Sequence, residues 1–255
     1  MKTWVDTDLT SILMNKTVSY ILAIFTIVAF VTIVILRSTS GFSLSSFTPY
    51  KSLIISGFFN TIYVSIVSLF GSLILGFVFY EFSISKSKYL IAFTDVFTEI
   101  IYGTPLLVLI VISAFVIGPA FNTYNRNLMG IAALIIYMTP YMKNVYKSAF
   151  SSITEEQYMA MDLFGFTPFQ RYRYIIIPQV IRILMPPLMN NFSLIIKGSA
   201  LLNVLSYNEL YYAIRVAQSK TFDFVEGYLL MWVIYLVITI PLSQLTKYIE
   251  RRWAL

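Results

Sequence analysis

The stretch TEEQYMAMDLFGFTPFQRYRYIIIPQVIRILMPP, residues 154–187, is the only long polar interruption in the second half of an otherwise apolar chain. It opens with a helix start, because Thr154 followed three residues later by Gln157 fits a capping box. In that motif the hydroxyl accepts a backbone N–H and the amide side chain reaches back to the cap. Gly165 then predicts the end of the helix, since only glycine enters the left-handed conformation at little cost.

A second helix start follows directly. Thr167 and Gln170 repeat the capping spacing, and the proline between them occupies the first helical position, where its missing N–H costs nothing. Pro178 and the pair at 186–187 are then expected to break or kink the chain that follows. The pattern predicts two short helices joined at a glycine turn, and we call residues 152–178 the elbow.

The composition is that of an integral membrane protein. Of 255 residues, 58% are apolar and 12% are charged, which is more apolar and less charged than a soluble domain. The basic residues lie between apolar spans, so the net charge of +6 does not indicate a nucleic-acid partner. Cysteine and histidine do not occur, and no nucleophile stands beside a base. We therefore expect neither a metal site nor an enzyme.

Six apolar stretches are long enough to cross a bilayer at 1.5 Å per residue. They cover residues 17–36, 52–80, 93–118, 128–146, 186–205 and 227–245. We expect an all-α membrane protein with about six transmembrane helices. A first helix and its linker would occupy residues 1–50, and a core domain would occupy residues 51–255.

Two of these stretches carry further signals. The second contains small residues that permit close helix contact, namely Gly57, Gly71, Ser72 and Gly76. The third is broken at Gly103, Thr104 and Pro105, which a membrane tolerates only where protein or a water-filled cavity satisfies the freed backbone groups. Residues 206–226 are expected to form an exterior loop with an interfacial helix.

Lysine and arginine are distributed unequally between the two faces. Six spans place both chain ends on the side of the elbow. That side has twelve basic residues, namely Lys2, Lys16, Lys86, Lys88, Lys143, Lys147, Arg171, Arg173, Arg182, Lys247, Arg251 and Arg252. The other side has five, namely Arg37, Lys51, Arg126, Arg215 and Lys220. The positive-inside rule therefore predicts that the elbow and both termini are cytoplasmic.

The elbow resembles the cytoplasmic EAA loop of ABC importer permeases, whose pattern is EAA, three residues, glycine, nine residues and I-x-L-P. The matching positions are Met159, Ala160, Met161, Gly165, Ile175, Ile177 and Pro178. The alanine, the glycine and the proline agree with the pattern, whereas methionine replaces the glutamate. The resemblance implies docking of an ATPase subunit on Met159, Ala160, Met161, Asp162, Gly165, Phe166 and Pro178.

Other segments resemble the polar amino acid subfamily of these permeases, the histidine, glutamine and arginine type, in the same order along residues 53–252. EIIYGTPLLV at 99–108 is similar to E-x-x-R-G-T-P-L-L-V, with Tyr102 where arginine is usual. PQVIRILMPPLMNNF followed by IIKGSALLNVL is similar to its P-Q-A-x-R-x-x-x-P-P-x-x-N-x-F and K-D-T-S-L stretches. IYLVITIPLSQLTKYIERR is similar to its last helix and basic tail.

The resemblance implies a five-helix type I importer permease core behind one additional helix, in a bacterial-type plasma (inner) membrane. It implies transport of polar amino acids or related small solutes. The implied partners are ABC ATP-binding subunits, a second permease subunit, an extracytoplasmic substrate-binding protein and the lipid bilayer. The chain has no P-loop motif, so we expect no cofactor in it, and ATP and Mg in the partner. Closure of the ATPase dimer would move the elbow and open the path outward.

The candidate translocation path consists of Glu99, Thr104, Pro105, Asn190, Asn191, Lys197 and Gly198. Lys197 lies in an apolar span, where an unpaired charge costs about 3 kcal/mol on insertion scales. It is expected to face protein or water, either as a path residue or in a structural ion pair with Glu99. The two asparagines either line the path or bridge helices.

Four positions depart from the subfamily pattern. They are Tyr102, Asn144, Met159 and Gly198, and at 144 and 198 an acidic residue is usual. The departures favour a heterodimer over a homodimer, because a second permease can supply the missing contacts. Two other functions stay open. An ion-coupled secondary transporter would need repeats and midplane carboxylates, whereas a membrane scaffold would have no use for the glycine and proline pattern of the elbow.

Overall fold

The computed structural model describes residues 16–38 and 42–253. Every regular element within these ranges is a helix, which confirms the all-α prediction. The first half contains α2 (Lys16–Ser38), η1 (Ser45–Tyr50), α3 (Lys51–Ser83), α4 (Lys88–Gly103), α5 (Leu106–Ile112), η2 (Ser113–Ile117) and α6 (Gly118–Ala120). The second half contains α7 (Arg126–Phe150), α8 (Glu155–Leu163), α9 (Pro168–Gln170), η3 (Arg171–Ile176), α10 (Ile177–Ser199), η4 (Ala200–Leu205), α11 (Leu210–Thr221) and α12 (Phe224–Trp253).

Five helical runs are long and apolar enough to cross a membrane, and a sixth span results if the bent pair α4 and α5–α6 is counted as one. That pair turns by 107° at the predicted break of Gly103, Thr104 and Pro105. The sequence-based count of about six spans is thereby confirmed. Lys2 lies outside the described residues, so the predicted side of the N-terminus itself is not described here.

The fifth span differs from the prediction. Residues 168–205 form one continuous helical run of 38 residues, so neither Pro178 nor the proline pair at 186–187 breaks it. The π-type turn η3 ends directly before Ile177, and its altered hydrogen-bond spacing accommodates a proline without an N–H. The second elbow helix is therefore the first part of the fifth span.

The core forms along the buried side of α3. Small residues recur on that side at spacings of three and four, namely Gly57, Thr61, Ser65, Ser68, Ser72 and Gly76, so that neighbouring backbones approach closely. A Cβ placed on Gly76 would overlap Met142 of α7, and one placed on Gly57 would lie 2.9 Å from the carbonyl oxygen of Glu209. A Cβ on Gly71 would lie 2.6 Å from Ile135 of α7. The close contacts predicted at the three glycines are thus present, two with α7 and one with the start of α11.

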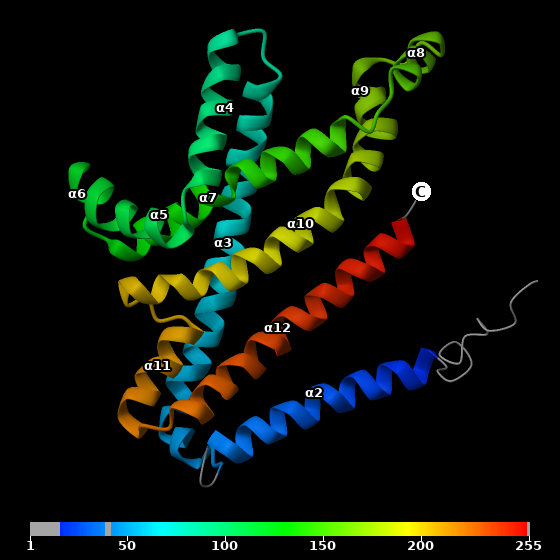
Figure 1. Ribbon diagram of the computed structural model, residues 1–255. Coiled ribbons are helices and arrows are strands. Elements are labelled where there is room, and N and C mark those ends of the chain that lie inside the picture. The colour runs from blue at the N-terminus through cyan, green and yellow to red at the C-terminus, as the bar shows by residue number, and fades with distance from the viewer. Residues whose placement is uncertain (1–15, 39–41, 254–255) are drawn as a thin grey trace, which may run out of the picture.

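The two ends of the bundle carry different elements. Figure 1 shows α8 and α9 at one end, on the same side as the C-terminus of α12, and α6 and α11 at the opposite end. The helix predicted within residues 206–226 is confirmed as α11, but it is not simply interfacial. Leu210, Ile214 and Ala217 on this helix are completely buried against α3 and α12. The α2 span, by contrast, has none of its residues buried.

Candidate functional site

The turn after α8 has the complete hydrogen-bond pattern of a Schellman motif. The N–H of Phe166 donates to the carbonyl of Met161 at 3.0 Å, and the N–H of Gly165 donates to that of Asp162 at 3.0 Å. Gly165 has φ +67°, in the left-handed region that glycine favours. The side chains of Phe166 and Met161 pack in the same apolar cluster. The predicted glycine stop is confirmed, and it is a defined turn with its own apolar support.

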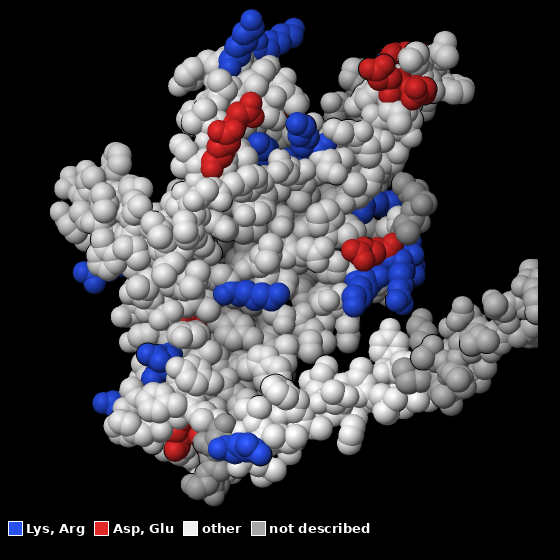
Figure 2. All heavy atoms as spheres, in the orientation of Figure 1, with Lys and Arg blue, Asp and Glu red and all other residues white. Residues whose placement is uncertain are grey.

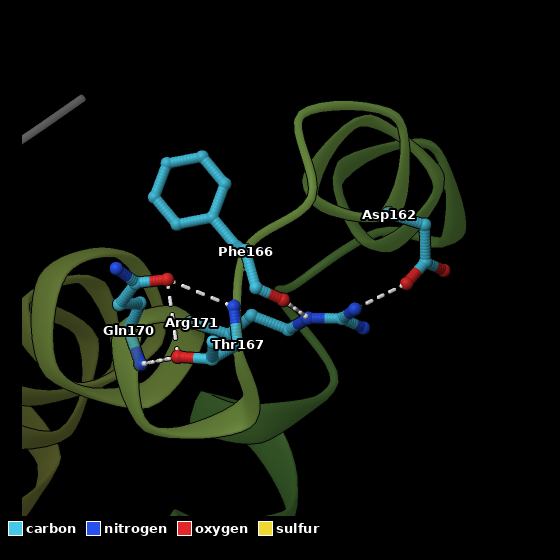
Figure 3. A network of polar contacts seen from close by, with 5 residues as sticks. All are labelled: Asp162, Phe166, Thr167, Gln170 and Arg171. Atoms are coloured by element: carbon cyan, nitrogen blue, oxygen red, sulfur yellow. Dashed lines mark hydrogen bonds and ion pairs between the residues drawn. The ribbon is translucent and has the colours of Figure 1, made fainter.

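The second helix start is also as predicted. Gln170 N–H donates to the Thr167 hydroxyl at 3.4 Å, and Thr167 N–H donates to the Gln170 amide oxygen at 2.9 Å, which completes the capping box (Figure 3). The first start is only half of the predicted motif. Thr154 caps α8, but the Gln157 amide donates to Gln179 at 3.4 Å instead of returning to the cap. The capping prediction for that side chain was wrong, because a longer-range partner on α10 is within reach.

Apolar side chains project from the elbow without a cover. Leu163, Phe164 and Phe169 are 88%, 81% and 74% exposed. We call these three residues the apolar tip. Figure 2 shows acidic side chains gathered over α8 beside it, where Glu155 and Glu156 form the first turn. Exposed apolar side chains at the end of a bundle make this turn a candidate contact surface for another protein.

The predicted docking residues divide into two groups by exposure. Met159, Ala160, Asp162, Gly165 and Pro178 are exposed, and Phe166 is partly buried. Met161 is 3% exposed and lies in a cluster with Ala149, Ile153, Ile176 and Val180. It therefore anchors α8 to α7 and α10, and a docked partner would touch its neighbours instead.

Lys197 is exposed on the α10 face that looks toward α12, and it lines two hollows. One, of about 390 Å³, is polar and is lined by Asn190, Ser193, Leu194, Lys197, Thr239, Ile240, Ser243 and Thr246. The other, of about 320 Å³, is mainly aromatic and is lined by Lys197, Ala200, Tyr211, Tyr228, Met231, Trp232 and Tyr235. Among the described residues the one ion pair within 4 Å joins Asp162 and Arg171. The structural ion pair between Lys197 and Glu99 is therefore not formed.

The neighbouring path candidates point to different sides of α10. Asn190 lines the polar hollow with Lys197, whereas Asn191 is buried and its amide lies 3.7 Å from the Met142 sulfur on α7. Asn191 thus bridges helices, as the simpler of the two sequence interpretations had it. A Cβ on Gly198 would lie 3.1 Å from Leu106. Gly198 therefore lies next to the first residue of α5, which directly follows Thr104 and Pro105 in the sequence.

The contact between α4 and α7 contains polar pairs that the sequence did not reveal. Asn144 donates to the Tyr102 hydroxyl at 2.7 Å, so two of the positions that depart from the subfamily pattern are partners. Next to them the ammonium of Lys143, which is 6% exposed, donates to Thr98 at 2.8 Å. Glu99 itself is exposed on α4. A neutral hydrogen bond thus joins two positions where charged residues are usual in the subfamily.

A second missed residue is Glu209, which is completely buried at the start of α11. Its carboxylate accepts from the N–H groups of Tyr211 and Tyr212 at 2.7 Å and from the Tyr235 hydroxyl on α12 at 3.2 Å. The hydroxyl of Thr61 on α3 accepts from the N–H of Leu210, the residue before Tyr211, at 3.0 Å. The local signal was a carboxylate directly before a helical apolar pattern. Its burial, however, depends on helices that are distant in the sequence.

Burial raises the pKa of Glu209 to about 7, although its three hydrogen bonds act in the opposite direction. The ordinary pKa of a glutamate is 4.5, so between that value and about 7 the folded state binds a proton that an exposed glutamate in the unfolded chain does not. The stability that Glu209 contributes is complete below pH 4.5 and is lost as the pH rises through about 7.

We expect the purified protein to unfold at lower temperature as the pH rises from 4.5 through about 7. Glu209→Gln should make the unfolding temperature less dependent on pH. Glu250→Gln, which changes an exposed carboxylate, is the control and should leave the pH dependence as it is. Equal pH slopes in the unchanged protein and both variants would contradict this prediction.

The family model described as "Binding-protein-dependent transport system inner membrane component" matches residues 72–255. The probable glutamine ABC transporter permease protein GlnM of Bacillus subtilis is 31% identical over 201 residues, which cover 79% of this chain and 93% of that protein. The histidine/lysine/arginine/ornithine transport system permease protein HisQ of Escherichia coli is 25% identical over 216 residues, which cover 80% of this chain and 95% of that protein.

Solved structures show the same fold. The crystal structure of an amino acid ABC transporter with histidines contains a chain that superposes with a TM-score of 0.74 at 27% identity, over 83% of this chain and 99% of that one. An inward-facing structure of the MetNI methionine ABC transporter gives 0.60 at 16% identity, over 79% and 98% of the two chains. The second similarity concerns the fold alone. The family model begins within α3 and therefore lies wholly after α2.

Proposed function

This chain belongs to the family of binding-protein-dependent transport system inner membrane components, and from that premise we propose that it carries polar amino acids or related small solutes inward. The protein is a membrane-embedded permease subunit of an ABC importer, and ATP hydrolysis takes place in separate subunits. The relatives named above are ABC permeases, and none supports an ion-coupled secondary transporter. Support for the substrate class comes from the similarity to glutamine and histidine/lysine/arginine/ornithine permeases.

The elbow is the element on which an ATPase subunit docks. The observation that carries this step is the apolar tip, which stands exposed on a turn fixed by a Schellman motif and a capping box. Burying three such side chains in a partner's groove removes a large apolar area from water. Because α9 continues without interruption into α10, a displacement of the docked elbow also displaces the span that carries Lys197.

We place the elbow and the C-terminus in the cytoplasm. The basic side chains flanking the spans are in excess at that end, including Lys86, Lys88, Lys247, Arg251 and Arg252, and the positive-inside rule applies to such flanking residues. With six spans the N-terminus lies on the same side of a bacterial-type inner membrane. The opposite end, with α11, then receives substrate from an extracytoplasmic binding protein.

The translocation surface lies on α10 and α12 around Lys197. Its position between a polar and an aromatic hollow gives an unpaired cation access to water or to a partner subunit, as the cost of burying it in lipid requires. Asn190 belongs to the same surface. Asn191 and Gly198 lie on other sides of α10, where they contact α7 and the start of α5. The α4–α5 break with Thr104 and Pro105 directly precedes that part of α5.

Lys197→Met should leave insertion and ATPase binding unchanged and should alter uptake. Methionine keeps the length and apolar stem of the side chain but removes the charge that the two hollows share. Uptake measured across substrate concentrations tests this, with Lys220→Met as a control for loss of a charge outside the spans. Uptake equal to that of the unchanged protein at every concentration would show that Lys197 is not part of the path.

The second permease subunit is a different chain in this proposal. Tyr102, Asn144, Met159 and Gly198 have lost charged or acidic groups that are usual in the subfamily, and a second, non-identical permease can supply them. Mass measurement of the intact purified complex decides between the two assemblies. One copy of this chain with another permease is expected, whereas two copies of this chain and no other permease would contradict the heterodimer.

Transport by the reconstituted complex tests the function as a whole. We expect uptake of a polar amino acid into proteoliposomes only when the ATPase subunits, the binding protein and ATP are present together. Uptake driven by an ion gradient with this chain alone would contradict the proposal. Omitting the binding protein from otherwise complete vesicles is the matched control, because it leaves the membrane components unchanged.

A further inference from the structure

One side chain makes polar contacts on both sides of the elbow turn. The guanidinium of Arg171 forms an ion pair with Asp162 near the end of α8, and its Nε donates to the backbone carbonyl of Phe166 at 2.9 Å (Figure 3). Arg171 itself is the first residue of η3 and so belongs to the helical run that continues to Leu205. It therefore contacts the docking helix, the turn and the span at once.

Between described residues, no other polar side-chain contact joins α8, the turn and the α9–α10 run at once. The capping box of Thr167 and Gln170 lies wholly on the α9 side of the turn, and the Schellman bonds end at Phe166. The Gln157–Gln179 bond, at 3.4 Å, joins α8 to α10 but makes no contact with the turn. Without Arg171, α8 and the α9–α10 run would be connected by the backbone of the turn, by apolar packing around Met161 and by the Gln157–Gln179 bond.

The arrangement favours a mechanical role over a contribution to stability. Asp162 is 61% exposed and Arg171 26% exposed, and ion pairs of this kind contribute about 0–1 kcal/mol to folding. The guanidinium, by contrast, has a planar fork that can hold two acceptors in a fixed relative position, which an ammonium does less well. Loss of the pair should thus allow the turn to bend while each helix persists.

We propose that Arg171 is a positioning residue that makes α8 and the α9–α10 helix one rigid unit, so that movement of a docked ATPase displaces α10 instead of bending the elbow. This inference rests on the proposed docking of the elbow. Asp162 then acts as the acceptor for the guanidinium and is not primarily a contact for the ATPase. The quantity that depends on Arg171 is the amount of substrate moved for each ATP hydrolysed.

The test uses the complete transporter in proteoliposomes, with uptake and ATP hydrolysis measured in the same vesicles. Arg171→Gln should keep ATPase co-purification and hydrolysis near the unchanged protein while uptake per ATP falls several-fold. Arg171→Lys, which retains the charge without the fork, should restore part of the ratio. Arg173→Gln, an exposed arginine two residues away, is the matched control and should leave the ratio unchanged.

Non-additivity and chemical rescue sharpen the test. Asp162→Asn combined with Arg171→Gln should lower the ratio no further than the stronger single change, because the two residues act as one contact. The chain contains no cysteine, so a short bifunctional thiol reagent can link the double variant Asp162→Cys, Arg171→Cys. The link should raise uptake per ATP, whereas the same reagent on either single cysteine variant should not.

The outcomes separate this inference from the function it rests on. If Arg171→Gln loses ATPase co-purification in proportion to uptake, Arg171 is a docking contact and the positioning role is wrong. An unchanged ratio in Arg171→Gln, or a link that fails to raise it, also overturns the inference. Failure of the proposed function is seen elsewhere, in an unchanged complex that shows no ATP-dependent uptake.

Discussion

Gly165→Val is expected to give a normally inserted protein that binds its ATPase weakly and loses ATP-driven uptake. Gly165 has φ +67°, and nothing lies within 4 Å of the position that a Cβ would occupy, so the effect would come from the backbone and not from a clash. A non-glycine residue in the left-handed region costs about 1–2 kcal/mol, which lowers the population of that turn roughly five- to thirtyfold. Loss of the turn removes both Schellman bonds and the fixed direction of the apolar tip.

Membrane level, ATPase co-purification and uptake should be measured in one preparation of this variant. Gly165→Asn is the matched control, because asparagine is the residue that best tolerates the left-handed region after glycine. We expect Asn to retain most of the uptake that Val loses. Full ATPase binding and uptake in Gly165→Val would show that the elbow turn does not position the docking element.

Local signals in the sequence predicted the local geometry of the elbow well. Gly165, Thr167 and Gln170 act through backbone groups within a few residues, so their conformations follow from the residues themselves. The break after Gly103 was also predicted from adjacent residues, because the Gly-Thr-Pro sequence disfavours a continuous helix at that point. The conformation at such positions can be predicted from the sequence because few alternative conformations compete with it.

The partners and the burial of side chains that contact residues far away in the sequence could not be predicted from the sequence. Gln157 had a local partner in the sequence interpretation, but its amide bonds Gln179, which only the fold brings near. Asn144 and Tyr102 are 42 residues apart, and their pairing depends on how α4 crosses α7. Glu209 is a helix cap by local sequence, whereas its burial depends on α3 and α12.

The prolines show how a strong local rule can be overridden. Proline removes a backbone bond in a helix, and the sequence therefore predicted a break or a kink at Pro178 and at 186–187; the break is absent from the helical run. The structure accommodates Pro178 after a π-type turn and continues through the pair in α10. Packing against α7 and α12 supports that helix on two sides. The resulting continuous helical run from α9 to η4 links the elbow directly to the part of α10 that carries Lys197.

Gly76→Val is expected to disrupt the fold itself, in contrast to the change at Gly165. Gly76 is buried on α3, where a Cβ would overlap that of Met142 and lie 3.1 Å from the backbone nitrogen of Lys143. The backbone of α7 cannot move aside like the end of a side chain, and the pairing of α3 with α7 is the most extensive helix contact in the described core. Overpacking at such a site typically costs about 1–3 kcal/mol, occasionally more.

We therefore expect Gly76→Val to lower the unfolding temperature of the detergent-purified protein and to increase the aggregated fraction on size-exclusion chromatography. The separation of α7 from α3 would also disturb Lys143 and its bond to Thr98, so uptake should fall together with stability. Ile74→Val, a change on the exposed side of the same helix, is the matched control and should behave like the unchanged protein. If Gly76→Val kept the same unfolding temperature and uptake as Ile74→Val, the close approach of α3 and α7 would not be required for the fold. In that case the small residues along α3 would have to be explained by something other than helix packing.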